Sequence, residues 1–171
     1  LQLVLNYEEG AENCILHGDA GAETFLSEII GAGERPGVRH RSMESIYEYG
    51  SRVGVWRLRQ LFETYQVPAT IFAAGMAVER NPQAIAALHA DGHEICSHGY
   101  RWIDYQYIDE ATERAHMQLA IQAIEQVTGE PSLGGLVEVT DHRSPPVLLV
   151  QHADRRHPGG EGARRAPEPG I

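Results

Sequence analysis

The sequence has few cysteines and lacks any long apolar run. Only Cys14 and Cys96 occur in 171 residues, and so few cysteines give no basis for a disulfide framework. No stretch approaches the ~18 consecutive apolar residues of a membrane-spanning helix, and no apolar core of a signal peptide precedes the first predicted strand. We therefore expect a cytoplasmic protein without a membrane partner, in which Cys96 is a small buried residue of a predicted strand.

Positive charge is also scarce. Lys and Arg total 14 against 24 Asp and Glu, which gives a formal net charge of −10. A nucleic-acid surface needs a stripe of Lys and Arg to neutralise phosphates, so we expect no nucleic-acid partner. The 42% hydrophobic and 22% charged residues are ordinary for a globular chain, and the length suits one domain with its own core.

Three short apolar segments alternate with three helical patterns. The predicted strands cover residues 3–5, 67–75 and 93–99, and the predicted helices cover residues 42–66, 81–92 and 108–129. This alternation is typical of parallel βαβ units and predicts an α/β fold. Because an eight-stranded α/β barrel normally needs ~250 residues, we expect a partial (β/α) barrel with about three of its βα units.

Local signals predict the helix ends and the buried faces. Ser42 is a candidate N-cap of the first helix, and Asn81 with Pro82 begins the second.

A segment of 31 residues (11–41), with a short helical candidate at 23–30, precedes the first helix. Such long connections usually carry function. The predicted buried stripe of the first helix consists of Ile46, Tyr49, Val53, Trp56 and Leu61.

The composition changes abruptly after Gly134. From Leu136 onward the chain contains no Phe, Trp or Tyr and is dense in Pro, Gly and Arg. We therefore assign residues 1–134 to the partial barrel domain and residues 135–171 to an atypical tail, either disordered or translated out of frame. Translating the coding DNA in all frames through Gly134 tests the second explanation, which fails if no other frame continues the α/β pattern.

Charged residues directly follow the first and third predicted strands. The stretch "NYEEG" places Glu8 and Glu9 after the first strand, and His98 ends the third. Carboxyl ends of parallel strands share one edge of a sheet, so we expect these three side chains to lie together. A carboxylate near a histidine can bind a divalent metal or deprotonate a water that attacks a carbonyl. A solvated acidic turn and a core histidine are the plain structural alternatives.

Several motifs carry a family resemblance. "NYEEG" resembles the first motif of the polysaccharide deacetylase superfamily, the NodB homology domain, which is usually Thr-Phe-Asp-Asp-Gly. "HGYRW" stands where that superfamily has His-Ser-x-x-His. A closer resemblance, over residues 1 to about 134, is to the cofactor-independent PuuE-type allantoinases, through "LNYEEGAENCILHGD", "ESIYEYGSRVGVWRL" and "EICSHGYRWIDY". It implies a NodB-type barrel and, in the full-length family, a homo-oligomer.

The resemblance also implies roles for the strand-end residues. In the metal-dependent deacetylases, the motif positions of the base and the metal ligands fall here on Glu8, Glu9, His98 and Trp102. Because Trp102 cannot ligate a metal, Glu9 and His98 alone leave a zinc site incomplete. We therefore expect Glu8, Glu9 and His98 to be catalytic without a cofactor, with zinc as the alternative.

The reaction implied by the resemblance is opening of the hydantoin ring of allantoin, a small ureide of purine catabolism. Either glutamate would be the base for water, and the histidine would donate to the oxyanion or to the leaving nitrogen. Arg101 and Trp102 are expected to bind and cover the substrate, and His17 to line the pocket. The alternatives are a metal-dependent N-deacetylase of polysaccharide or peptidoglycan, and a catalytically inactive fragment.

Overall fold

The described part of the protein is a small parallel α/β unit. The computed structural model describes residues 2–24, 29–33 and 35–130. The three strands form one parallel sheet in the order β1-β2-β3, with β1 at Leu3–Tyr7, β2 at Ala69–Ala73 and β3 at Glu94–Ser97. This confirms the predicted α/β fold and its parallel strands. The predicted boundary at residue 134 and the tail 135–171 lie outside the described residues.

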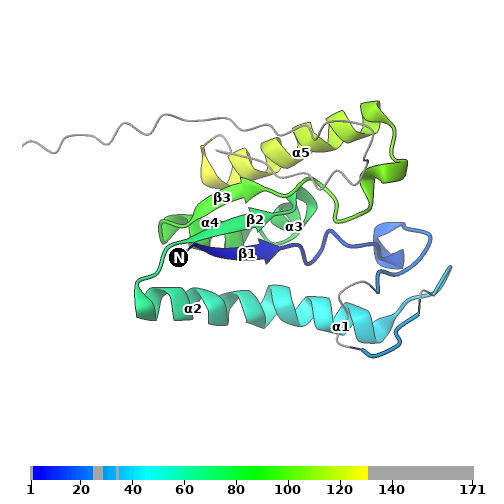
Figure 1. Cartoon of the computed structure of the whole chain (residues 1–171), viewed down its shortest axis with the longest axis horizontal. Helices are drawn as coiled ribbons and strands as arrows, with labels where there is room; N and C mark the ends of the chain where they lie inside the picture. Colours follow the sequence, from blue (N-terminus) through cyan, green and yellow to red (C-terminus); the bar gives the residue numbers. More distant parts are fainter. Residues whose placement is uncertain (1, 25–28, 34, 131–171) are drawn as a thin grey trace, which may run out of the picture.

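Helices follow each strand and flank the sheet. They are α1 (Arg41–Tyr49), the π-helical turn η2 (Gly50–Gly54), α2 (Val55–Tyr65), α3 (Gly75–Arg80), α4 (Pro82–Ala90) and α5 (Glu110–Thr128), with short 3-10 turns η1 (Ile15–His17) and η3 (Tyr105–Tyr107). In Figure 1, α2 runs along β1 and α1 continues past the carboxyl end of that strand, α5 lies beside β3, and α3 and α4 lie behind the sheet. Within the described residues, no helix combines the length and apolarity needed to cross a membrane.

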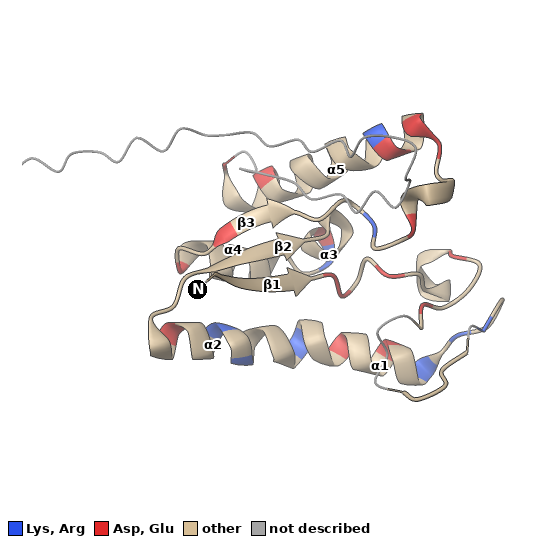
Figure 2. Ribbon diagram, in the orientation of Figure 1, with Lys and Arg blue, Asp and Glu red and all other residues tan. Residues whose placement is uncertain are grey.

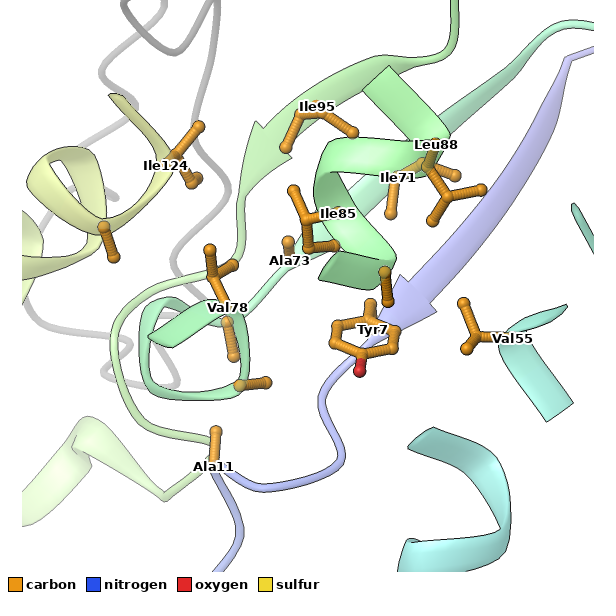
Figure 3. Packing of buried hydrophobic residues seen from close by; sticks show 14 of the residues in the cluster. Tyr7, Ala11, Val55, Ile71, Ala73, Val78, Ile85, Leu88, Ile95 and Ile124 are labelled. Atoms are coloured by element: carbon orange, nitrogen blue, oxygen red, sulfur yellow. The ribbon is translucent and has the colours of Figure 1, made fainter. Parts of the chain in front are cut away.

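The core fills the space between the sheet and the helices behind it. Alternate residues of β1 face opposite sides: Leu5 packs against the core, whereas Val4 is 51% exposed. Ile71 of β2 and Ile85 of α4 are fully buried, and Figure 3 shows them in the same cluster as Tyr7. Burial raises the pKa of Tyr7 to about 12, against the lowering effect of the hydrogen bond that its hydroxyl accepts from an amide at the start of α4.

The predicted first helix is interrupted by a π-helical turn. The helical region begins at Arg41, and its N-cap is His40, so the prediction that Ser42 caps it is wrong. The η2 turn between α1 and α2 adds residues to one helical turn and rotates the faces of α2 relative to those of α1. Tyr49, Val53 and Leu61 are consequently exposed rather than part of a buried stripe, and Val55 is buried in their place.

Two further predictions need correction. Asn81 does precede α4, and Pro82 is its first residue, but the Asn81 side chain makes no capping bond. Its amide donates instead to the hydroxyl of Tyr7 at 2.8 Å and to the carbonyl of Ser51 at 3.0 Å. The helix α3 was not predicted, and of the helical candidate 23–30 the described residues 23, 24, 29 and 30 are not helical.

Candidate active site

Glu8 and His98 meet at the carboxyl edge of the sheet. Glu8 follows β1 and His98 follows β3, and Glu8 Oε1 lies 2.7 Å from His98 Nε2. Both side chains are largely shielded from solvent, with 17% and 10% exposed. The prediction that the parallel strands bring Glu8, Glu9 and His98 together is confirmed for Glu8 and His98, which we call the Glu8–His98 pair.

The pair forms across the end of the central strand. Only small residues, Ala73, Ala74 and Gly75, stand at the carboxyl end of β2, so no long side chain from these positions separates the partners. The backbone of this strand end binds both neighbours: the Ala74 amide donates to the Tyr7 carbonyl at 3.0 Å, and Ala73 accepts from the His98 amide at 2.9 Å. The position of the pair therefore follows from the parallel sheet itself.

Glu9 follows Glu8 directly but packs against a different element. Its carboxylate lies against Gly50 in the η2 turn, where a Cβ on the glycine would be 2.8 Å from Glu9 Cδ. Burial raises the pKa of Glu9, and the charges of Glu8 and Glu12 raise it further, against the lowering effect of nearby backbone amides. The two consecutive glutamates thus have different surroundings, and only Glu8 is within ion-pair distance of His98 among the described contacts.

The described residues do not form a metal site. No group of three His, Cys, Asp or Glu side chains within the described ranges could hold a metal ion. The fourth motif position is Trp102, whose indole offers an N–H donor and no lone pair for a metal, and the Glu9 carboxylate lies against Gly50. The donor set present in the described ranges therefore does not fit the catalytic zinc considered as an alternative.

A pocket of about 550 Å³ opens beside Glu9. Its wall comes from the loop after β1, from α1, η2 and the start of α2, and from the end of α3 and the start of α4, and it includes Glu9, His17 and Trp56. The predicted substrate-binding residue His17 therefore does line a pocket. Its imidazole Nδ1 lies 2.8 Å from Nη1 of Arg80, which also belongs to the wall. Figure 2 shows acidic residues in the loop that leaves β1 toward this region.

Arg101 and Trp102 connect the loops that follow β1 and β3. Arg101 pairs with Asp19 at 2.8 Å, and the Trp102 amide donates to the Ala11 carbonyl at 3.0 Å. The Trp102 ring packs edge-on against Tyr47 at a centroid distance of 6.3 Å. The structure thus gives both residues protein contacts at the site, and their binding of substrate stays a prediction.

Two residues of the site were not predicted from the sequence. Asp19 supports the loop after β1, and its place in the motif "LHGD" was the available signal. Gly50 makes room for the Glu9 carboxylate, but a glycine within a helical pattern indicates only weak helix propensity. The contact of each depends on a residue far away in the chain, which no local pattern reveals.

The fold and the edge site define a parallel α/β domain with a carboxylate–imidazole pair at the carboxyl ends of its strands. The family profile of the polysaccharide deacetylases matches residues 37–134, which is more than half of the chain. The chain therefore belongs to the polysaccharide deacetylase family, whose members include hydrolases of the NodB type, and the predicted family is confirmed.

Individual relatives extend the match toward the N-terminus. A Schizosaccharomyces pombe protein whose name places it among the polysaccharide deacetylases is 45% identical over 130 residues, which are 75% of this chain and 40% of that protein. A solved structure of a Pseudomonas aeruginosa PAO1 protein with a similar name has a TM-score of 0.77 at 58% identity. A solved structure of Puue allantoinase has a TM-score of 0.77 at 56% identity.

These relatives are longer than the chain. Each of the two solved structures is matched over 84% of this chain and 47% of its own. The chain thus spans less than half the length of the relatives it matches, and these matches agree with a partial NodB-type barrel.

Proposed function

We propose that the domain belongs to a hydrolase that opens the ring of a small cyclic ureide such as allantoin. The observation that carries the proposal is the 2.7 Å contact between Glu8 and His98 at the carboxyl edge of the sheet. The 56% identity to a protein named as an allantoinase supports the substrate class. The substitution of the usual metal-ligand position by Trp102 favours chemistry that needs no metal.

The pair can supply both proton transfers of an amide hydrolysis. Glu8 takes a proton from water as the water oxygen bonds to the ring carbonyl carbon. The carbon–nitrogen bond then breaks, and His98, which enters the step as an imidazolium ion, gives its Nε2 proton to the leaving nitrogen and becomes neutral. Glu8 returns the first proton to His98 across their short contact, which restores the pair and leaves one water added to the substrate.

The surroundings of the pair suit this role. Both side chains are shielded from bulk water, which strengthens their interaction. We place the substrate beside the pair and extend it toward the pocket at Glu9, where His17 lies in the wall. Glu9 then contacts the substrate rather than the attacking water, and Trp102 closes the other side of the site.

The test is ureide hydrolysis by the purified chain after exhaustive chelation, followed as release of allantoate. We expect turnover that survives chelation and falls at least ~100-fold in Glu8→Gln and in His98→Ala, because general acid–base catalysis typically contributes ~10²–10⁴-fold. Glu125→Gln is the matched control, since Glu125 is exposed on α5 away from the sheet edge. Equal loss in this control would contradict the assignment.

A polysaccharide or peptidoglycan deacetylase is the second candidate, favoured by the family match. It predicts acetate release from N-acetylglucosamine oligomers, dependent on added zinc. Such release without ureide hydrolysis would replace the proposal with the deacetylase. A folded chain that performs neither reaction, with or without zinc, would refute the proposal for this chain and favour an inactive fragment.

A further inference from the structure

The sheet alone holds Glu8 and His98 only indirectly. β2 lies between β1 and β3, and neighbouring strands are about 4.8 Å apart, so the two outer strands are separated by about twice that spacing. No hydrogen bond of the described sheet joins β1 to β3 directly. The sheet therefore places the pair at one edge, and a connection between the loops that follow these two strands can restrict the geometry of its 2.7 Å contact further.

Arg101 provides that connection. Its Nε donates to the carbonyl of Ala11 at 3.2 Å, and its Nη2 reaches the carbonyl of Glu12 at 3.4 Å. The amide of the next residue, Trp102, also donates to the Ala11 carbonyl, at 3.0 Å. The loop after β3 is thus bound to the loop after β1 at the fully buried residue Ala11.

Asp19 holds the guanidinium in place. Its Oδ2 accepts from Arg101 Nη2 at 2.8 Å and from the Cys14 amide at 2.8 Å. The Arg101 side chain is 13% exposed and the Asp19 side chain 19%, so solvent screens this ion pair much less than a surface ion pair. We call Asp19, Arg101 and the two carbonyls that Arg101 binds the Asp19–Arg101 clasp.

The clasp is close to both members of the pair along the chain. The Ala11 amide donates to the Glu8 carbonyl at 2.9 Å, so the bound loop begins at Glu8 itself. On the other strand, Arg101 follows His98 by three residues, through Gly99, which has a φ of +76°. The Arg101 loop is therefore directly continuous with His98, and the amides of Gly75 and Met76 hold the intervening Gly99 and Tyr100 carbonyls at 2.9 Å.

We propose that Arg101 and Asp19 are positioning residues that hold the loops after β1 and β3 together and so fix the geometry of the Glu8–His98 pair. Arg101 then acts through the protein, in contrast to the substrate contact that the family resemblance implies for it. The inference rests on the proposed function for its catalytic consequence, whereas the geometric part can be measured without any turnover.

The experiment compares Asp19→Asn and Arg101→Lys with Asp91→Asn. Asparagine keeps the shape of Asp19 without its charge, and lysine keeps the charge of Arg101 without the planar fork that binds several acceptors. Asp91 pairs with Arg59 through two hydrogen bonds of 2.6 and 2.9 Å. That ion pair joins α2 to the turn after α4, at the opposite edge of the sheet, and serves as the matched control.

Two measurements are made on each variant of the full chain. The first is the NMR signal of the His98 ring N–H and the exchange rate of the Trp102 amide, which donates to Ala11 and not to Asp19 itself. We expect both clasp variants to lose the His98 signal and to speed Trp102 exchange about tenfold, with no change in Asp91→Asn. Unchanged signals in both clasp variants would overturn the inference.

The second measurement is kcat and KM for ureide hydrolysis. A misplacement of about 1 Å can cost up to ~100-fold in rate, so both clasp variants should lose kcat at least about tenfold with KM nearly unchanged. A rise in KM confined to Arg101→Lys, with normal Asp19→Asn, would instead make Arg101 a substrate-binding residue. If the wild-type chain does not hydrolyse ureides, the proposed function fails, and the NMR result still decides whether the clasp holds the pair.

Discussion

The carboxylate of Glu9 occupies the space that a side chain on Gly50 would need. A Cβ built on Gly50 would lie 2.8 Å from Glu9 Cδ and 3.0 Å from Glu9 Cγ. This glycine begins the π-helical turn η2, and π-helical turns are frequent at functional sites. The bend in the helix and the position of the acidic residue are thus parts of one arrangement.

Gly50→Ala should be less stable than Gly54→Ala by about 1 kcal/mol, because the new methyl group displaces the partly buried Glu9 carboxylate. Urea unfolding measures this change. Gly54→Ala is the matched control in the same turn, since its Cβ would meet only the Tyr49 carbonyl at 3.7 Å. That control should be neutral or stabilising by up to ~1 kcal/mol. Equal effects of the two substitutions would contradict the close packing of Glu9.

Asp19→Asn should lower the melting temperature at neutral pH and not at strongly acid pH. Burial raises the pKa of Asp19, but the hydrogen bonds and charge of Arg101 and the Cys14 amide outweigh it and leave the pKa below its ordinary 3.8. A depressed folded-state pKa contributes stability above about pH 3.8, which is lost as the pH falls through the folded value. The difference between wild type and variant should therefore be constant from pH 5 to 7 and shrink below about pH 3.8. A pH-independent difference would show that the charge of Asp19 contributes nothing.

Both cysteines should resist thiol reagents in the folded protein. Burial raises the pKa of Cys96 to about 11, with a further increase from Glu94, and burial also raises the pKa of Cys14. The thiolate is the reactive form, so neither group should react quickly at pH 7. Titration with a chromogenic disulfide reagent should label both cysteines only after denaturant is added. Rapid labelling of either one in the native chain would contradict its burial of more than nine-tenths.

The meeting of Glu8 and His98 was predictable from the sequence. Two apolar strands linked by helical segments had to be parallel, and parallel strands place their carboxyl ends at one edge. The apolar pattern of the third predicted strand also predicted that Cys96 is buried, and the structure confirms this. Local periodicity and the strand order were sufficient in these cases.

The separation of Glu8 from Glu9 was not predictable in the same way. Consecutive residues face opposite directions, but the turn after β1 and the contact with Gly50 decide where the second carboxylate lies. Likewise, Arg101 and Asp19 are 82 residues apart. The exposure of Val53 and Leu61 results from a π-helical turn that the spacing of apolar residues does not reveal. Each of these features depends on tertiary contacts between distant segments.

The proposed mechanism requires Glu8, and not Glu9, to be the base. The deciding measurement is kcat for ureide hydrolysis by Glu8→Gln and Glu9→Gln, each after chelation. Since only Glu8 contacts His98 among the described ion pairs, kcat should fall at least ~100-fold in Glu8→Gln and remain close to that of the wild type in Glu9→Gln. A collapse of kcat in Glu9→Gln with Glu8→Gln still active would contradict the mechanism.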